Sequence, residues 1–461
     1  MSIKDFSRLE KIVLIIISVS ILGRFFILPF VSGLWWDEAV YLSLGRNLGS
    51  GIYSLDEFVL FETERPPLVP FLVYFSSESV LLSRIILSLL SVLGVIASYY
   101  LAKEAFGKKA ALWASLFLAC GYFFMFYTIK ILSEGVFMLF LSLSALFFIR
   151  ALKTNKIYFY IGSGVCAGLT VMARHFGVLI LLGYTLSLIY LSVSKRQKKF
   201  LGYLLTVLLF SLITLSPWIA LTSKYYSNPI SAFLAKFDHV SGPYEYGLFR
   251  TASDYFFVWY VSAAFLIIGL AYILRTKIDK IKSVILLSFF LSIIFYLLLP
   301  GYKEPRYLLG FMPLATCIAG FGFVKLTEKG LKKVTASIVI LLYIVSISSS
   351  FLWIWEDRIA SKDLVEAGLY LKGIGQKNEI VMTLYHPYIY YLSQKRSVFL
   401  PRETDQVENV INDKGVKYIL MHKNDKNYPG QGFFDTNPKF TKLAEFGQPW
   451  DTKLVVIYKV L

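Results

Sequence analysis

Long apolar stretches separated by short polar loops run through the first three quarters of the chain. A membrane-spanning helix needs about 20 mostly apolar residues, and about eleven stretches meet or approach that length. We predict spans at 12–31, 82–102, 110–129, 133–150, 157–173, 176–194, 200–221, 253–274, 283–299, 307–324 and 334–355. The pattern therefore predicts a polytopic all-α membrane domain over residues 1–355.

After residue 355 the pattern changes to short alternating segments. No apolar run of span length occurs in residues 356–461. We predict strands at 379–384, 397–401, 417–422 and 453–460, helices at 362–371 and 405–413, and a surface loop at 424–438. This alternation predicts a small, soluble α/β domain.

Composition agrees with a membrane protein. The 461 residues are 56% hydrophobic and only 17% charged, whereas soluble domains carry about 25% charged residues. The net charge of +17 would suit a nucleic-acid partner, but the basic residues cluster in short loops between spans. We therefore expect no nucleic acid and a chain that contacts membrane lipid.

The distribution of Lys and Arg predicts the orientation. Alternate loops and the N-terminus together hold 21 basic residues, and the opposite loops hold about nine. By the positive-inside rule the richer face is cytoplasmic. The N-terminus is then cytoplasmic, and the first loop (32–80) and the C-terminal domain are extracytoplasmic. The first stretch is longer than a signal-peptide core of roughly 7–15 residues, so we expect a retained span.

The first outer loop carries two groups of candidate chemistry. Asp37 and Glu38 follow Trp35 and Trp36, and either carboxylate could act as a general base toward an acceptor hydroxyl. The alternative is a pair of solvated charges beside interfacial tryptophans. Arg65 precedes two prolines that restrict the backbone, which suits phosphate binding or simply a loop entering the membrane.

Three further polar sites fall on the same predicted face. Glu134 opens a span, where helix capping alone would explain it. Arg174 and His175 interrupt an apolar stretch, and ionisable residues at membrane depth are often functional. Lys303 and Arg306 share a short loop with Glu304, and could clamp a phosphate or form a solvated turn.

Metal binding is not indicated by any spacing pattern. The four histidines are scattered, and Cys120, Cys166 and Cys317 all lie in apolar stretches. We therefore predict no metal site or other certain cofactor. A divalent cation remains open because acidic residues without a ligand pattern occur in the first loop, namely Asp56, Glu57 and Glu62.

Taken in order, a set of short motifs resembles a known family. The residues are Asp37-Glu38 with Ala39, Tyr41 and the run from Arg46 to Gly51, Arg65-Pro66-Pro67-Leu68, Ser133-Glu134, Arg174, Ser216-Pro217-Trp218, and Glu304-x-Arg306-Tyr307-Leu308 with Pro313. Together they resemble the GT-C superfamily of membrane glycosyltransferases, in the branch with protein O-mannosyltransferases and the lipid A aminoarabinose transferase. Arg174 stands where that branch commonly has Lys.

The resemblance implies a transferase whose donor is a sugar on a polyprenyl or dolichyl monophosphate. Its acceptor would be a hydroxyl of a lipid, glycan or protein at the outer membrane face. The implied catalytic residues are Asp37 as general base with Glu38 and Glu134 assisting. The implied phosphate ligands are Arg65, Arg174, Lys303 and Arg306. Substrate-positioning roles fall on Tyr41, Glu304 and Tyr307.

Two other classes of membrane protein stay open as alternatives to this transferase. A transporter or flippase would favour internal repeats, broken helices and charges near the bilayer midplane, whereas the candidate charges here gather at one face. A ligase or polymerase of lipid-linked glycans would place its key residues in one large late outer loop. In this chain the longest loop between predicted spans is the first.

Overall fold

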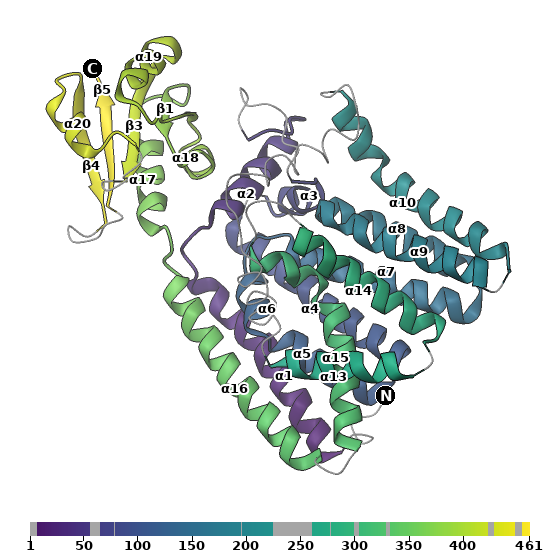
Figure 1. Ribbon diagram of the computed structural model, residues 1–461. Coiled ribbons are helices and arrows are strands. Elements are labelled where there is room, and N and C mark those ends of the chain that lie inside the picture. The colour runs from purple at the N-terminus through teal and green to yellow at the C-terminus, as the bar shows by residue number, and fades with distance from the viewer. Residues whose placement is uncertain are drawn as a thin grey trace. The chain divides into compact units, whose positions relative to one another are not determined.

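The computed structural model describes residues 7–55, 65–77, 79–194, 196–224, 261–276, 278–298, 304–328, 332–422, 428–447 and 454–461. These residues form two compact units (Figure 1). The first, here called the helical unit, takes its described residues from Met1–Pro29, Thr63–Leu72 and Val80–Trp355. The second, the sheet unit, takes its described residues from Phe30–Glu62, Val73–Ser79 and Glu356–Leu461. Much of the first loop thus groups with the C-terminal residues, and the predicted domain boundary at residue 355 stays a prediction.

The helical unit has a helix at each predicted stretch. Its helices are α1 (Arg8–Ile27), η2 (Leu28–Phe30), α3 (Leu68–Tyr74), α4 (Val80–Phe106), α5 (Lys108–Ala119), α6 (Tyr122–Tyr127), α7 (Glu134–Thr154), α8 (Ile157–Ala173), η3 (His175–Gly177), α9 (Val178–Ser194), α10 (Lys199–Ser223), α13 (Ser262–Arg275), α14 (Lys280–Leu298), η4 (Pro305–Phe311), α15 (Met312–Leu326) and α16 (Lys332–Asp357). The last residues of η2, α3 and α16 belong to the sheet unit. Among the described residues, eight helical segments are long and apolar enough to cross a membrane. The polytopic helical fold is confirmed, and the number of spans stays a prediction.

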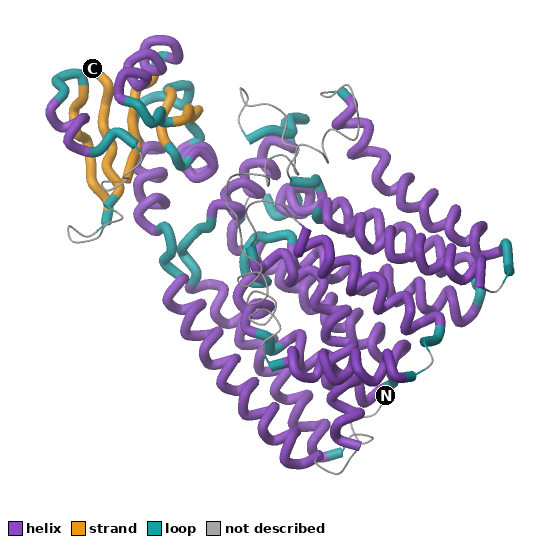
Figure 2. Tube along the Cα trace, viewed as in Figure 1, coloured by secondary structure: helices purple, strands orange, loops and turns teal. Residues whose placement is uncertain are grey.

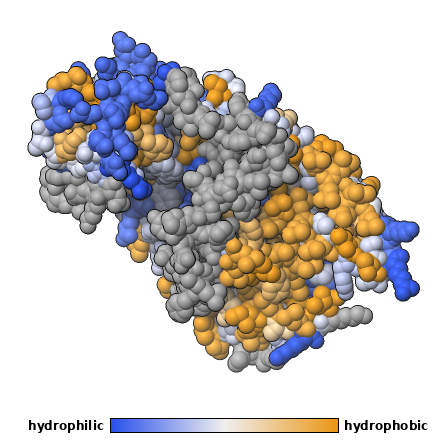
Figure 3. Space-filling model, turned by 45° about the horizontal axis from the view of Figure 1, so that its top comes forward, coloured by the Kyte–Doolittle hydropathy of each residue, from blue (hydrophilic) through white to orange (hydrophobic). Residues whose placement is uncertain are grey.

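The surface of the helical unit suits lipid contact. Large apolar side chains, including Phe26, Val193 and Leu205, are exposed on it. Figure 3 shows hydrophobic residues over much of the helical surface that this view presents. Burying such surface in hydrocarbon is favourable, whereas leaving it in water is not.

The predicted span 110–129 is interrupted. Helix α5 ends at Ala119 and α6 begins at Tyr122. Neighbouring helices supply hydrogen bonds at the break, because Ser20 Oγ donates to the Ala119 carbonyl at 2.8 Å and Ser346 Oγ donates to the Cys120 carbonyl at 3.2 Å. Backbone groups freed in a membrane helix need such partners, so the break is stabilised from both sides.

Helix α7 packs against α4 and α8, and charged residues lie at both of its ends. Its 21 residues extend over roughly 30 Å, about the thickness of a bilayer core. At its C-terminal end, the Glu104 carboxylate accepts from Lys153 Nζ at 2.8 Å and from Arg150 Nε at 3.4 Å. The opposite end begins with Glu134, which is buried.

The sheet unit contains the predicted α/β domain. Its elements are α2 (Trp36–Leu48), α17 (Lys362–Gly373), β1 (Ile380–Thr383), α18 (His386–Ser393), β2 (Arg396–Phe399), α19 (Thr404–Lys414), β3 (Val416–His422), α20 (Gln431–Thr436), β4 (Phe440–Phe446) and β5 (Val455–Val460). The strands, drawn in orange in Figure 2, are ordered β2-β1-β3-β5-β4. Strand β1 pairs in parallel with β2 and β3, and β5 pairs antiparallel with β3 and β4. The core of the sheet includes Met382, Val407, Ile419, Phe434, Val456 and Tyr458.

The predicted loop at 424–438 is wrong in part. Helix α20 forms within it because Phe434 is fully buried in the core of the sheet, while residues 423–427 lie outside the described residues. The prediction also missed α18 and the strand β4, which pairs with β5. The sequence signal that could have revealed these elements was aromatic residues scattered among polar ones, since no apolar run marks them.

Candidate active site

The helix α2 carries the two carboxylates of the first loop. Its first turn contains Asp37 and Glu38, where the positive end of the helix dipole stabilises anions. The Trp35 backbone N–H donates to Glu38 Oε2 at 2.9 Å, and Glu38 is fully buried. Glu38 therefore caps the helix, while Asp37 is only half-buried.

Tyr41 lies one turn beyond Asp37 on the same helix. Residues four apart share a helix face, so Asp37 and Tyr41 lie on the same face of α2. Tyr41 is buried, with 6% of its surface exposed. A role for Tyr41 in substrate positioning stays a prediction.

In the helical unit, Glu134 pairs with Arg174. The distance from Arg174 Nη1 to Glu134 Oε1 is 2.7 Å, with 2% of the Glu134 side chain and 20% of the Arg174 side chain exposed. Arg174 has extended backbone angles between α8 and η3, so the interruption of the helix presents its guanidinium to α7. Glu134 and Arg174 were predicted as separate site residues, and the structure brings them together.

The 304–307 segment adjoins this pair. Arg174 lies over the Tyr307 ring, with its guanidinium carbon 4.7 Å from the ring centroid. Arg306 Nη2 donates to Glu304 Oε1 at 3.1 Å, and Phe176 packs edge-on against Tyr307 at 5.7 Å. Arg174 and Arg306, two of the predicted phosphate ligands, therefore each have a carboxylate partner. A phosphate bound here would either displace those carboxylates or bind beside them.

Two of the predicted phosphate ligands, Arg65 and Lys303, stay predictions. Arg65 is half-buried in the turn before α3, and its place near the other cations stays a prediction. Lys303 lies outside the described residues, as do Asp56, Glu57 and Glu62. Within the described ranges, no three His, Cys, Asp or Glu residues lie together as a metal site.

Three buried cations were not predicted from the sequence: Arg24, Arg84 and Lys130, each at most 2% exposed. Arg24 Nη1 donates to Thr128 Oγ1 at 2.5 Å, and its guanidinium lies 4.7 Å from the Phe124 centroid. Ser88, one turn after Arg84, donates to the Thr128 carbonyl at 3.0 Å. A basic residue inside an apolar stretch was the signal that could have found Arg24 and Arg84.

The predicted site residues divide between the two units. Asp37, Glu38 and Tyr41 belong to the sheet unit, and the described remainder belongs to the helical unit, namely Arg65, Glu134, Arg174, Glu304, Arg306 and Tyr307. A single site that combines both groups stays a prediction.

The fold defines a class of protein. Residues 65–220 match the family described as dolichyl-phosphate-mannose-protein mannosyltransferase. Over nearly the whole chain, the structure has the GT-C fold of membrane glycosyltransferases, as the resemblance predicted.

Three solved structures illustrate the likeness. ArnT from Cupriavidus metallidurans, bound to undecaprenyl phosphate, has a TM-score of 0.71 and 13% identity over 97% of this chain and 98% of its own. AglB, the oligosaccharyltransferase of Archaeoglobus fulgidus, solved with an inhibitory peptide and a dolichol-phosphate, has a TM-score of 0.59 and 13% identity over 90% and 70%. The mycobacterial arabinofuranosyltransferase AftD has a TM-score of 0.57 and 13% identity over 99% and 40%. No curated protein sequence matches the chain.

Proposed function

We propose that this protein is a glycosyltransferase that uses a sugar carried on a polyprenyl or dolichyl monophosphate. The fold supports this proposal most strongly, since it matches ArnT over 97% of the chain. ArnT was solved with undecaprenyl phosphate and AglB with dolichol-phosphate, which favours a lipid monophosphate as the carrier. The acceptor is a hydroxyl of a lipid, glycan or protein at the outer membrane face.

Asp37 is the general base in this proposal. Among the three candidate carboxylates, Glu38 caps α2 and Glu134 is paired with Arg174. Asp37 is half-buried in the first turn of α2, where the helix dipole favours the ionised form that accepts a proton. Glu38 and Glu134 then act by fixing the positions of their partners.

The reaction is a displacement at the anomeric carbon. The acceptor oxygen forms a bond to that carbon and gives its proton to Asp37, while the bond to the phosphate oxygen breaks. The leaving polyprenyl phosphate gains negative charge, which nearby cations stabilise. Arg174 and Arg306 are the described candidates with a position in the cluster, and Arg65 and Lys303 complete the proposed set.

The test is sugar transfer by the full-length protein in membranes, with a panel of polyprenyl- and dolichyl-phosphate sugars. Asp37→Asn keeps the size of the side chain and removes the base, so transfer falls about 10²–10⁴-fold. Asp405→Asn is the matched control, because Asp405 is an exposed residue of α19 and the change is chemically identical. Both variants must reach wild-type levels in the membrane.

Each outcome is informative. Full activity of Asp37→Asn would remove Asp37 as the base and leave the class of enzyme intact. Absence of transfer by the wild type across the donor panel would contradict the proposal and favour the transporter or flippase class. In that case, uptake or translocation of labelled lipid-linked sugar is the next measurement.

A further inference from the structure

The segment that leads into α2 is bound to the first residues after the last membrane helix. The Gly33 N–H donates to the Arg358 carbonyl at 2.6 Å, and the Leu34 N–H donates to the Ala360 carbonyl at 3.2 Å. Trp35 Nε1 donates to both oxygens of the Asp357 carboxylate, at 3.0 and 3.2 Å. All these residues belong to the sheet unit.

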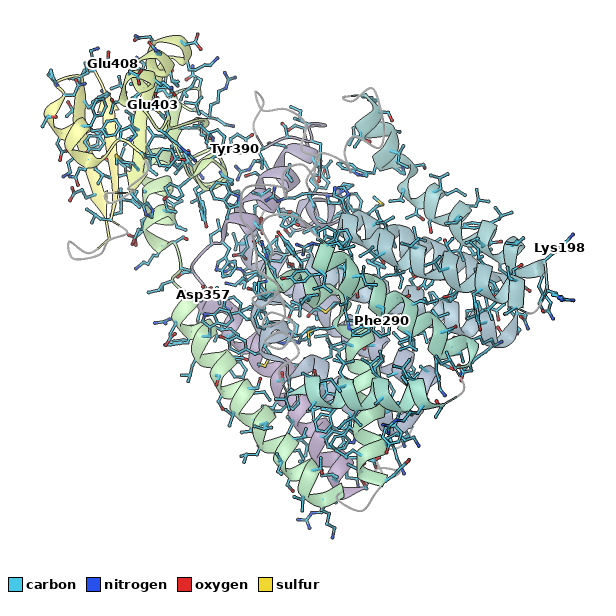
Figure 4. The ribbon with its side chains drawn as sticks, viewed as in Figure 1. Lys198, Phe290, Asp357, Tyr390, Glu403 and Glu408 are labelled. Carbon is cyan, nitrogen blue, oxygen red and sulfur yellow. The ribbon has the colours of Figure 1, made fainter. Side chains whose placement is uncertain are left out.

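The far end of α2 is bound to α18. The Tyr390 hydroxyl donates to Asn47 Oδ1 at 2.9 Å. Arg46 Nη1 donates to the Tyr391 carbonyl at 3.0 Å, and its guanidinium lies 4.8 Å from the Tyr391 centroid. Figure 4 labels Tyr390 on α18 and Asp357 at the end of α16, which are the two ends of this attachment.

Between these ends, Tyr388 lies beside the first turn of α2. Its ring packs edge-on against Trp36 with centroids 6.1 Å apart. Burial raises the pKa of Tyr388, and the negative charges of Glu38 and Asp37 add to the rise. The carboxylate-bearing turn of α2 is therefore close to α18.

We infer that the C-terminal domain positions the proposed base, and that Asp357 is a positioning residue acting through Trp35. This inference rests on the proposed function. A helix of 13 residues is marginal by itself in water, so its placement depends on its contacts. Catalytic groups displaced by about 1 Å lose about 100-fold in rate, so the attachment of α2 determines how well Asp37 meets the acceptor.

The activity test compares three variants of the full-length protein. Asp357→Ala removes the acceptor for the Trp35 indole, and we expect kcat to fall about tenfold or more. Donor KM should stay within about twofold, because the proposed phosphate ligands belong to the helical unit and not to the segment that Asp357 holds. Asp357→Asn keeps an oxygen acceptor and restores most of the rate. Glu356→Ala, which changes the neighbouring exposed acid, leaves kcat unchanged.

A second readout needs no substrate. The three native cysteines are buried, so Asp37→Cys introduces one thiol whose rate of maleimide labelling reports the order of the first turn. We expect Asp357→Ala to raise this rate severalfold relative to Glu356→Ala. Equal labelling rates in the two backgrounds would overturn the positioning role whether or not transfer is detected. A raised rate without any transfer by the wild type would support positioning and contradict the proposed enzyme.

Equal kcat values for Asp357→Ala and wild type would also overturn the inference. A fall in kcat that Asp357→Asn does not restore would assign the effect to the charge of Asp357, against the hydrogen-bond role inferred here.

Discussion

Glu134 and Arg174 form an ion pair of 2.7 Å between the start of α7 and the interruption after α8. Removing charges from water is costly, and the cost is recovered only when the partners remain together. The same Arg174 guanidinium lies over the Tyr307 ring. A change in the ion pair would therefore also change the contact with Tyr307.

Breaking this pair from one side will destabilise the helical unit. Arg174→Met leaves the Glu134 carboxylate buried without its cation, which costs about 3–5 kcal/mol. We expect a lower yield of monodisperse protein and a lower melting temperature. Glu134→Gln combined with Arg174→Met removes both charges and should recover much of the stability, though not sugar transfer. Equal destabilisation by the single and double changes would contradict a buried pair.

Gly33→Ala tests the contact between the first-loop segment and the C-terminal domain. A Cβ at Gly33 would collide with backbone atoms of Ala360, so the two segments must separate, at a cost of about 1–3 kcal/mol. We expect faster proteolysis of the sheet unit and reduced transfer. Gly202→Ala is the control, because a Cβ there would meet no atom within 4 Å. Wild-type resistance of Gly33→Ala to protease would show that the contact is dispensable.

Ser20 and Ser346 stabilise the break between α5 and α6. Replacing both with Ala leaves two backbone carbonyls without these donors, and side-chain hydrogen bonds in membranes contribute about 0.6 kcal/mol each on average. The double variant should unfold about 1 kcal/mol more easily in a detergent titration. Ser115→Ala is the control, since Ser115 bonds only within its own helix in the described contacts, to Ala111 O at 3.0 Å. Identical titrations would exclude a stabilising role.

Acid should destabilise the C-terminal domain through His386. Burial lowers the pKa of this imidazole from 6.5 to about 4, so the unfolded chain binds more protons between these values. Stability contributed by neutral His386 is complete above pH 6.5 and decreases as the pH falls toward 4, by about 3 kcal/mol at most. The urea midpoint for loss of protease resistance in this domain should fall over that range.

His386→Asn tests the assignment because it removes the titrating ring and keeps a polar partner for Ser397, whose Oγ lies 3.0 Å from His386 Nδ1. The variant should have a flatter dependence on pH between 6.5 and 4. An unchanged dependence would place the effect on other groups.

The length of the apolar stretches predicted the helical fold well. A segment that crosses a bilayer must be long and apolar and must satisfy its own backbone hydrogen bonds, however it packs. The break at Cys120–Gly121 was not predictable from hydropathy, since its hydrogen-bond donors come from Ser20 and Ser346, distant in the sequence. In the C-terminal domain, the strands with apolar runs were found, whereas α20 was missed because Phe434 packs into the sheet from a polar segment.

The candidate site was only partly accessible to sequence reasoning. Glu134, Arg174 and Tyr307 were proposed individually from their residue types and positions, and the structure supplies the contacts among them. The capping role of Glu38 depends on the backbone N–H of Trp35, whereas the residue types alone predicted Asp37 and Glu38 as a catalytic pair. Lys130 was missed because its burial depends on tertiary packing.

The bond between Trp35 and Asp357 joins residues 322 positions apart in the chain. At a synthesis rate of about 5–20 residues per second, the second partner leaves the ribosome roughly 15–65 s after the first. During that interval the membrane helices can insert, while α2 still lacks the segment around Asp357 to which it is later bound. Formation of the proposed catalytic centre therefore waits for the synthesis of Asp357, and chains interrupted before that residue would reach the membrane without this attachment of α2.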